Sequence, residues 1–166
     1  MDRRDGYIMN EIMLRAENIE RTYHAGSVDV PALKNCTLEF GQGEFTAIIG
    51  KSGSGKSTLL NIIGGIDEAD SGTITVNGEV IQNMNEKNLT QYRRKHLGYV
   101  FQMYNLIPNL NVKENIEVGA YLSDNPLDID DLLKTLGLYE HRHKLPNQLS
   151  GGQQQRTSIG RAIVKN

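Results

Sequence analysis

Eight consecutive residues have the types and spacing needed to hold phosphate groups. They read GKSGSGKS, begin at Gly50 and fit the pattern G-x-x-x-x-G-K-[ST]. Glycines let the backbone turn its amides inward, where they can wrap phosphate oxygens. Lys56 supplies a point charge for the outer phosphates, and the Ser57 hydroxyl can ligate Mg²⁺, which prefers oxygen ligands. The residues expected to contact a bound nucleotide are Gly50, Lys51, Ser52, Gly53, Ser54, Gly55, Lys56, Ser57 and Thr58.

The segments that flank this loop have the patterns that such a site requires. Residues 45–49 form a short apolar run without alternation, typical of a strand buried in a parallel sheet. Residues 56–63 predict a helix, whose first amides and positive dipole end would face the phosphates. The alternative is a glycine- and serine-rich linker that matches by chance, expected in about one per cent of chains this long. The loop alone does not distinguish a kinase, a GTPase and a transporter ATPase.

Local patterns in the rest of the chain predict a mixed α/β fold. Strands are expected over residues 12–23, 36–40 and 97–101, and alternation around Asn77 and Gly78 indicates a hairpin. Helices are expected over residues 86–96, 111–122, 128–136 and 150–164, two of them with capping-box spacing at their start. Antiparallel strands, a buried strand of parallel type and a helical stretch together indicate α/β with a helical insertion.

Composition sets limits on the partners of the chain. It has 166 residues, which favours one domain with a real core. The formal net charge of −2 gives no basic field, so we expect no nucleic-acid partner. The single cysteine, Cys36, cannot form an internal disulfide, which suits a reducing compartment. No run approaches the ~20 apolar residues that span a bilayer, so we expect a soluble chain that reaches a membrane only through a partner.

A second short segment narrows the class of phosphate-binding protein. Residues 149–153 read LSGGQ. Ser150 is suited to cap the following helix, and the two glycines leave its first amides open to an anion. With these residues the chain resembles the ATP-binding subunits of ABC transporters, in which this sequence is the signature. The resemblance implies contacts to the γ-phosphate of ATP on the other protomer of a head-to-tail dimer from Leu149, Ser150, Gly151, Gly152 and Gln153.

Two further residues match functional positions of the same family. Tyr23 lies where the family has an aromatic side chain that stacks on adenine; a tyrosine that simply packs in the core is the alternative. Gln102 matches the Q-loop glutamine, which the resemblance places near Mg²⁺ and the attacking water; an ordinary surface glutamine is the alternative. Residues 103–116 resemble the segment that meets the coupling helix of the membrane subunit, unless they are buried in the helical insertion.

The resemblance covers essentially the whole chain. Residues 43–67 and 97–108 look most like exporters that handle macrolides, lipoproteins and antimicrobial peptides, although Lys51 stands where that family often has proline. It implies a P-loop ATPase core with an antiparallel β subdomain over residues 1–101. Residues 102–166 would carry the Q-loop, the helical subdomain and the signature helix. The implied activity is hydrolysis of MgATP coupled to export through a transmembrane permease, at the cytoplasmic face of the cell membrane.

One part of the family pattern has no counterpart in these residues. In the family, a strand ending in Asp-Glu follows the signature helix, and its Glu acts as general base. Here no acidic residue follows Glu140. We therefore expect a chain that ends before this strand and binds ATP without hydrolysing it. The alternatives are an ABC ATPase without a transport role and a non-catalytic nucleotide-binding protein.

Overall fold

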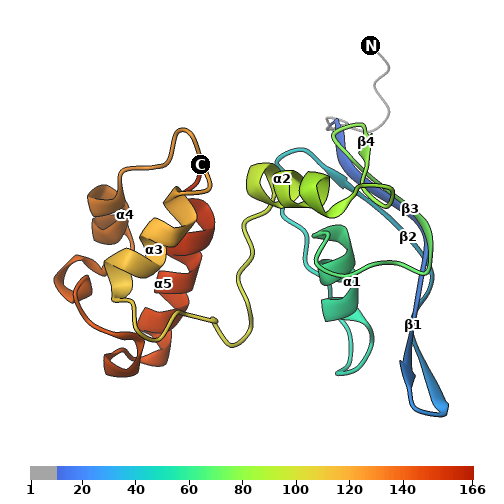
Figure 1. Ribbon diagram of the computed structural model, residues 1–166, viewed down its shortest axis with the longest axis horizontal. Helices are drawn as coiled ribbons and strands as arrows, with labels where there is room; N and C mark the ends of the chain where they lie inside the picture. The colour runs from blue at the N-terminus through green and yellow to red at the C-terminus, as the bar shows by residue number, and fades with distance from the viewer. Residues whose placement is uncertain (1–10) are drawn as a thin grey trace, which may run out of the picture. The chain divides into compact units, whose positions relative to one another are not determined.

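The computed structural model describes residues 11–166. The chain divides into two compact units, one that ends at Thr90 and one that runs from Gln91 to Asn166. The division that we expected after Phe101 stays a prediction. The first unit contains β1 (Ile12–Ala25), β2 (Val28–Gly41), α1 (Lys56–Ile63), β3 (Ser71–Val76) and β4 (Glu79–Val80). The division between the units falls within α2 (Glu86–His96), and the second unit continues with α3 (Val112–Ala120), α4 (Ile129–Thr135), two short 3₁₀ turns (Tyr139–His141 and Pro146–Gln148) and α5 (Gly151–Ile163), as Figure 1 shows.

The first unit is built on one antiparallel sheet. Its strand order is β2-β1-β3-β4, and long β1 and β2 form a hairpin in which Tyr23 lies opposite Val30. The turn between β3 and β4 is Asn77-Gly78, with φ of 48° and 81°. Positive φ at both central residues is the geometry of a type I′ turn. The predicted hairpin at this pair and the predicted first two strands are confirmed.

Alternating apolar side chains make the core of the first unit. Leu14 and Ala16 of β1 pair with Val76 and Ile74 of β3, and all four are buried. Helix α1, which we predicted over the same residues, lies beside this sheet in Figure 1 and buries Leu59 and Ile62. The core therefore fixes α1, and with it the loop that leads into the helix.

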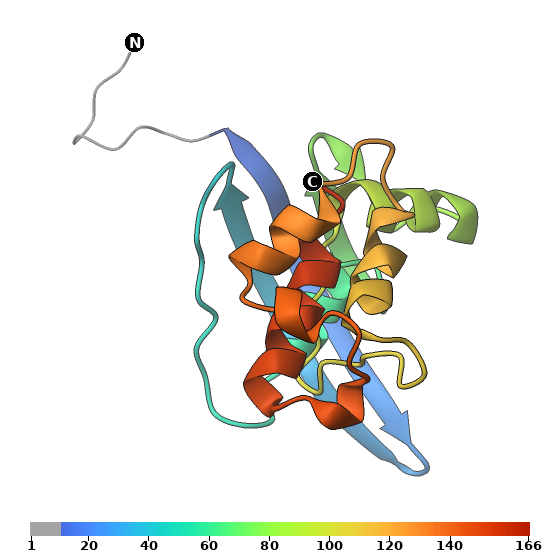
Figure 2. The same cartoon turned by 90° about the vertical axis from the view of Figure 1, so that its left-hand side faces the viewer.

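The second unit is helical, and α3 packs along α5 (Figure 2). Its hydrophobic cluster contains Val112, Ile116, Leu132, Leu133, Leu138, Leu149 and Val164. Gly160 makes the close approach possible, because a Cβ atom there would lie 2.9 Å from Cδ1 of Ile116. The capping boxes predicted at Asn111 and Ser150 are confirmed, and Asp128 caps α4.

Two predicted strands are wrong. Residues 45–49 and 97–101 form no strand, and the sheet contains no parallel pair among residues 11–166. A strand needs a neighbour that accepts and donates ladder hydrogen bonds, and no described segment supplies one. Phe45 and Ile49 are accordingly 97% and 91% exposed. Within residues 97–101, Gly98 instead lies against α5, where a Cβ atom would lie 2.7 Å from the carbonyl oxygen of Ala162.

None of the helices described between residues 11 and 166 combines the length and the apolar character needed to cross a membrane.

Candidate functional site

The predicted phosphate loop is an irregular segment that leads directly into α1. Gly53 and Gly55 have φ of 77° and 84°, in the left-handed region that favours glycine. Gly55 also packs against the carbonyl oxygen of Ala32 on β2, so closely that a Cβ atom would collide with it. At Gly50 a Cβ atom would lie 2.6 Å from Oγ of Ser54. The loop therefore needs glycine at these places for its shape, and the resulting bare backbone can approach a ligand.

Lys56 reaches back across this loop. Its Nζ donates to the carbonyl oxygens of Gly50 at 2.9 Å and Lys51 at 2.7 Å, and lies 3.4 Å from Oγ of Ser54. The side chain is half-buried, and these hydrogen bonds hold its ammonium group against the backbone of the loop. A positive charge is thus fixed beside the backbone amides that we predicted to wrap a phosphate.

The N-terminus of α1 is open. Gly55 is its N-cap residue and provides no side-chain cap, and no acidic residue lies in the first turn. The first helical hydrogen bond runs from Leu59 N to Gly55 O at 2.8 Å, so the amides of the first turn have no helical acceptor. Ser57, the predicted Mg²⁺ ligand, lies exposed on this turn, and Thr58 follows it. Uncapped amides and an uncompensated dipole end favour an anion here.

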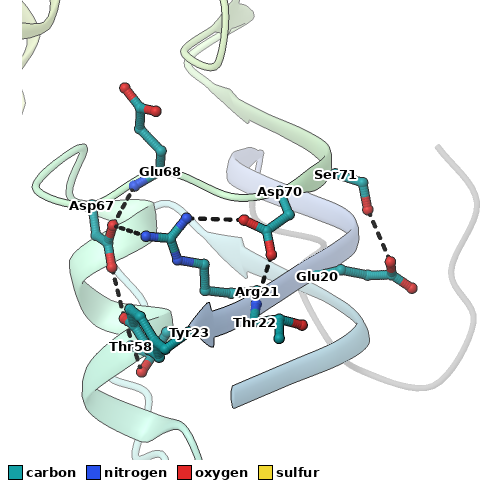
Figure 3. Close-up of polar contacts among 9 residues, drawn as sticks. All are labelled: Glu20, Arg21, Thr22, Tyr23, Thr58, Asp67, Glu68, Asp70 and Ser71. Carbon is teal, nitrogen blue, oxygen red and sulfur yellow. Dashed lines mark hydrogen bonds and ion pairs between the residues drawn. The ribbon is translucent and has the colours of Figure 1, made fainter. Parts of the chain in front are cut away.

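Tyr23 lies next to the same helix (Figure 3). Its hydroxyl donates to Oδ2 of Asp67 at 2.7 Å and lies 3.5 Å from Oγ1 of Thr58. The guanidinium of Arg21 lies over the ring, with Cζ 4.9 Å from the ring centroid. Tyr23 is 36% exposed, so it is not a buried core residue. The structure thus places the predicted aromatic residue beside the predicted phosphate loop, within one unit.

Arg21 and two aspartates link β1 to the segment that follows α1. Arg21 Nη2 binds Oδ1 of Asp67 and Arg21 Nη1 binds Oδ1 of Asp70, both at 2.9 Å (Figure 3). Asp70 also accepts the backbone N–H of Thr22 at 2.6 Å. This hydrogen bond, aided by Arg21, lowers the pKa of Asp70 below its ordinary value. The pKa of Arg21 is raised, since the two carboxylates outweigh the opposing effect of burial. No sequence pattern pointed to this network, because Arg21 lies 46 residues from Asp67 and 49 residues from Asp70.

The signature segment forms the N-terminus of α5. Ser150 and Gln153 make the reciprocal capping box, with Ser150 N donating to Oε1 of Gln153 at 2.9 Å. Gly151 and Gly152 are exposed, and a Cβ atom at Gly151 would meet nothing within 4 Å. The side chain of Leu149 is buried in the hydrophobic cluster, so only its backbone can face a ligand. An anion can therefore reach the first amides of α5 directly.

Gln102 is exposed in a turn of the second unit. The residues after it are tied to α5: Ser158 Oγ donates to the Tyr104 carbonyl at 3.1 Å, and Arg161 donates to the carbonyls of Tyr104 and Asn105 at 2.9 and 2.8 Å. Burial lowers the pKa of Arg161. These anchors were not predicted, since nothing in the pattern of α5 marks its polar residues as contacts of this loop.

Asn115, on α3, holds the next part of the same loop. It is fully buried, and its side chain bonds Ile107 N, Ile107 O, Leu110 O and Asn111 O at 2.8–3.1 Å. Every hydrogen-bonding position of the amide except one lone pair is thus used. Asn115 was also missed from the sequence. A polar residue on the apolar face of a predicted helix was the available signal.

The described residues contain no cluster of three or more His, Cys, Asp or Glu side chains that could hold a metal ion. Ser57 and Gln102, the predicted ligands of Mg²⁺, lie in different units. Neutral oxygen donors of this kind suit a metal held mainly by substrate phosphates and water, which is how Mg²⁺ is commonly bound.

Comparisons with known proteins agree with one another. The family model described as "ABC transporter" matches residues 33–166. A putative ABC transporter ATP-binding protein of Mycoplasma pneumoniae is 47% identical over 159 residues, which are 94% of this chain and 34% of that protein. The ABC transporter ATP-binding protein YtrE of Bacillus subtilis is 41% identical over 163 residues, 93% of this chain and 71% of its own length. The macrolide export ATP-binding/permease protein MacB of Shigella flexneri is 45% identical, over 92% of this chain and 24% of its own.

Solved structures show the same likeness in three dimensions. The ATP-binding cassette MJ0796, solved as a dimer bound to ADP and Pi, superposes with a TM-score of 0.86 at 39% identity. The match covers 93% of this chain and 70% of that one. The chain spans about a third of the length of the Mycoplasma relatives. The predicted fold class, an α/β P-loop ATPase with antiparallel β and helical signature subdomains, is confirmed by this likeness.

Proposed function

Because the chain belongs to the ABC transporter family of ATP-binding proteins, we propose that it binds MgATP as part of an ATPase that drives export through a membrane permease. The observation that carries the proposal is the loop of residues 50–57. In this loop Lys56 donates hydrogen bonds to two loop carbonyls, and α1 begins without a side-chain cap. These groups offer a fixed cation, unpaired amides and a positive dipole end at one place. That combination is suited to a polyphosphate.

Each part of the loop has a separate task in this proposal. The amides of the loop and of the first turn of α1 bind phosphate oxygens, and Lys56 exchanges its contacts with the loop carbonyls for contacts with the outer phosphates. Ser57 supplies an oxygen ligand to Mg²⁺, which neutralises charge on the phosphates. The bare backbone at Gly50 and Gly55 fits a ligand that must come close. Gln102 is proposed as the residue that contacts Mg²⁺ and the attacking water.

The signature residues serve the ATP molecule of a second subunit in this proposal. The amides of Gly151 and Gly152 are accessible at the start of a capped helix, which favours an anion such as a γ-phosphate. The likeness to a cassette solved as a dimer supports a head-to-tail pair. The name of the MacB relative, which joins ATP-binding and permease functions, supports a membrane partner and a location at the inner face of the membrane. Residues 103–116 are proposed to meet that partner, and Met103 is 79% exposed there.

We further propose that these 166 residues bind ATP without turning it over. General-base catalysis typically contributes 10²–10⁴-fold to rate, and residues 141–166 contain no carboxylate that could act as base. The test is steady-state phosphate release by purified protein, with Lys56→Ala as the control for contaminating ATPases. Release equal to that control is expected. Release above the control that scales with protein concentration would show that these residues contain a base.

A further inference from the structure

We propose that Asp67 and Arg21 are positioning residues that make Tyr23 a one-sided stacking platform for the nucleotide base. This inference rests on the proposed function, because it assumes that the triphosphate binds at residues 50–57. It extends that function to two residues that come from β1 and from the segment after α1. Neither residue is part of the phosphate loop or of the signature.

The first step concerns the orientation of the ring. The Tyr23 hydroxyl donates to Asp67 at 2.7 Å, and Asp67 lies four residues beyond the end of α1. Asp67 is itself fixed, because it accepts Arg21 Nη2 at 2.9 Å and the backbone N–H of Glu68 at 2.8 Å. A tyrosine on the surface of a hairpin would otherwise rotate about its two side-chain torsions. This hydrogen bond between Tyr23 and Asp67, the tether, therefore holds the ring at one angle beside α1.

The second step concerns the two faces of the ring. Arg21 lies over one face at 4.9 Å, within the range of a cation–π contact. The guanidinium is held there by Asp67 and Asp70, and its side chain is only 22% exposed. Arg21 therefore occupies one face of Tyr23. The opposite face is left to stack on a planar ligand.

The third step concerns the distance to the phosphate site. The hydroxyl of Tyr23 lies 3.5 Å from Oγ1 of Thr58, which is two residues after Lys56 on α1 (Figure 3). The ring edge thus reaches the first turn of the helix that would hold the phosphates. A nucleotide bound by its phosphates at that turn has its base within reach of the ring. Stacking on an aromatic side chain accepts any base, because every base presents a π-face.

The experiment compares two ligands by calorimetric titration of the 166-residue protein: MgATP and Mg-tripolyphosphate, which lacks the base and sugar. Tyr23→Ala is expected to weaken MgATP binding about 5- to 100-fold, the range of one base–aromatic stack, and to leave tripolyphosphate unchanged. Asp67→Ala should weaken MgATP binding about three- to tenfold, again without an effect on tripolyphosphate, since it disorders the ring without removing it. Asp67→Asn keeps an acceptor for the hydroxyl and should recover part of the loss.

Two further variants separate positioning from general damage. In a Tyr23→Phe background the tether is already absent, so Asp67→Ala should cost less than in the parent protein. Glu20→Gln is the matched control, because Glu20 precedes Arg21 on β1 and its carboxylate accepts the Ser71 hydroxyl at 3.2 Å. It should change neither affinity.

The outcomes are distinct. An equal loss of MgATP and tripolyphosphate affinity in Asp67→Ala, or no loss of either, would overturn the positioning role while leaving the proposed function intact. Failure of the parent protein to bind MgATP would overturn the proposed function, and the inference with it. Binding of MgATP without binding of tripolyphosphate would overturn the premise that the phosphates anchor the ligand at residues 50–57, and with it this inference alone.

Discussion

Gly55 lies so close to the carbonyl oxygen of Ala32 that no side chain fits between them. This contact seats the start of α1, and therefore the phosphate loop, directly on β2. Gly55→Ala combines a collision with the strain of φ near 84°. We expect a loss of about 2–4 kcal/mol in the free energy of unfolding, from overpacking and left-handed strain together.

Gly53→Ala is the matched control for Gly55→Ala. Gly53 has a similar φ of 77°, but a Cβ atom there would meet nothing within 4 Å. Strain alone should cost about 1–2 kcal/mol. Urea denaturation followed by circular dichroism measures both variants. Equal losses would contradict the packing of Gly55 on Ala32.

The signature helix depends on its cap. Ser150→Ala removes the side chain that accepts from Gln153 N, and should lower the free energy of unfolding by about 1 kcal/mol. Ser150→Asn keeps a good cap and should be nearly neutral. The same urea titration compares the two variants, and indistinguishable losses would argue against a stabilising role of the cap.

The loop after Gln102 depends on Asn115. Asn115→Ala leaves the partly buried Ile107 N–H and the carbonyls of Ile107 and Leu110 without this partner, and each unsatisfied group costs about 1–3 kcal/mol. We expect at least ~2 kcal/mol of destabilisation. Asn109→Ala, on the exposed part of the same loop, should stay within about 0.5 kcal/mol of the parent. Hydrogen exchange of the Ile107 amide should also accelerate in Asn115→Ala alone.

Asp70 predicts an acid-sensitive contribution to stability. Its pKa in the folded protein lies below the ordinary 3.8, chiefly because it accepts the Thr22 N–H. A lowered folded pKa means that the contribution is complete above the ordinary value and is lost as pH falls through the folded value. Asp70→Asn should therefore be less stable than the parent at pH 7, and the difference should shrink steadily below about pH 4.

The control for this pH series is Asp124→Asn, which changes an exposed aspartate in the other unit. Unfolding free energies of the three proteins at pH 7, 4 and 2.5 give the comparison. A difference between Asp70→Asn and the parent that grows toward low pH would have the wrong sign and would contradict the role given to Asp70.

The elements predicted correctly are those whose cause is local. The capping box at Ser150 and Gln153 and the type I′ turn at Asn77-Gly78 each depend on residues within four positions of one another. The predicted bounds of α1 and α2 were matched to the residue, since periodicity and end signals lie inside the segment. The glycines of the predicted phosphate loop also act on their own backbone, while the binding role of the loop stays a prediction.

What failed or was missed depends on partners far away in the chain. The apolar composition of residues 45–49 indicated a strand, but a strand exists only where another backbone pairs with it. The tether between Tyr23 and Asp67 joins residues 44 positions apart. The bonds from Arg161 to the loop after Gln102 span more than 50. Asp67 and Arg161 each look like ordinary surface residues in the sequence.

The measurement that tests the central claim most directly is a calorimetric titration of MgATP into the parent protein and Lys56→Ala. Lys56 would make a charge-assisted contact with phosphate, worth roughly 1.5–3 kcal/mol, so its loss should weaken binding about ten- to a hundredfold. Lys87→Ala is the matched control, because Lys87 is an exposed lysine of the first unit that lies outside the phosphate loop. It should bind as the parent does. Equal affinities of the parent and Lys56→Ala, or no binding by the parent, would contradict the account.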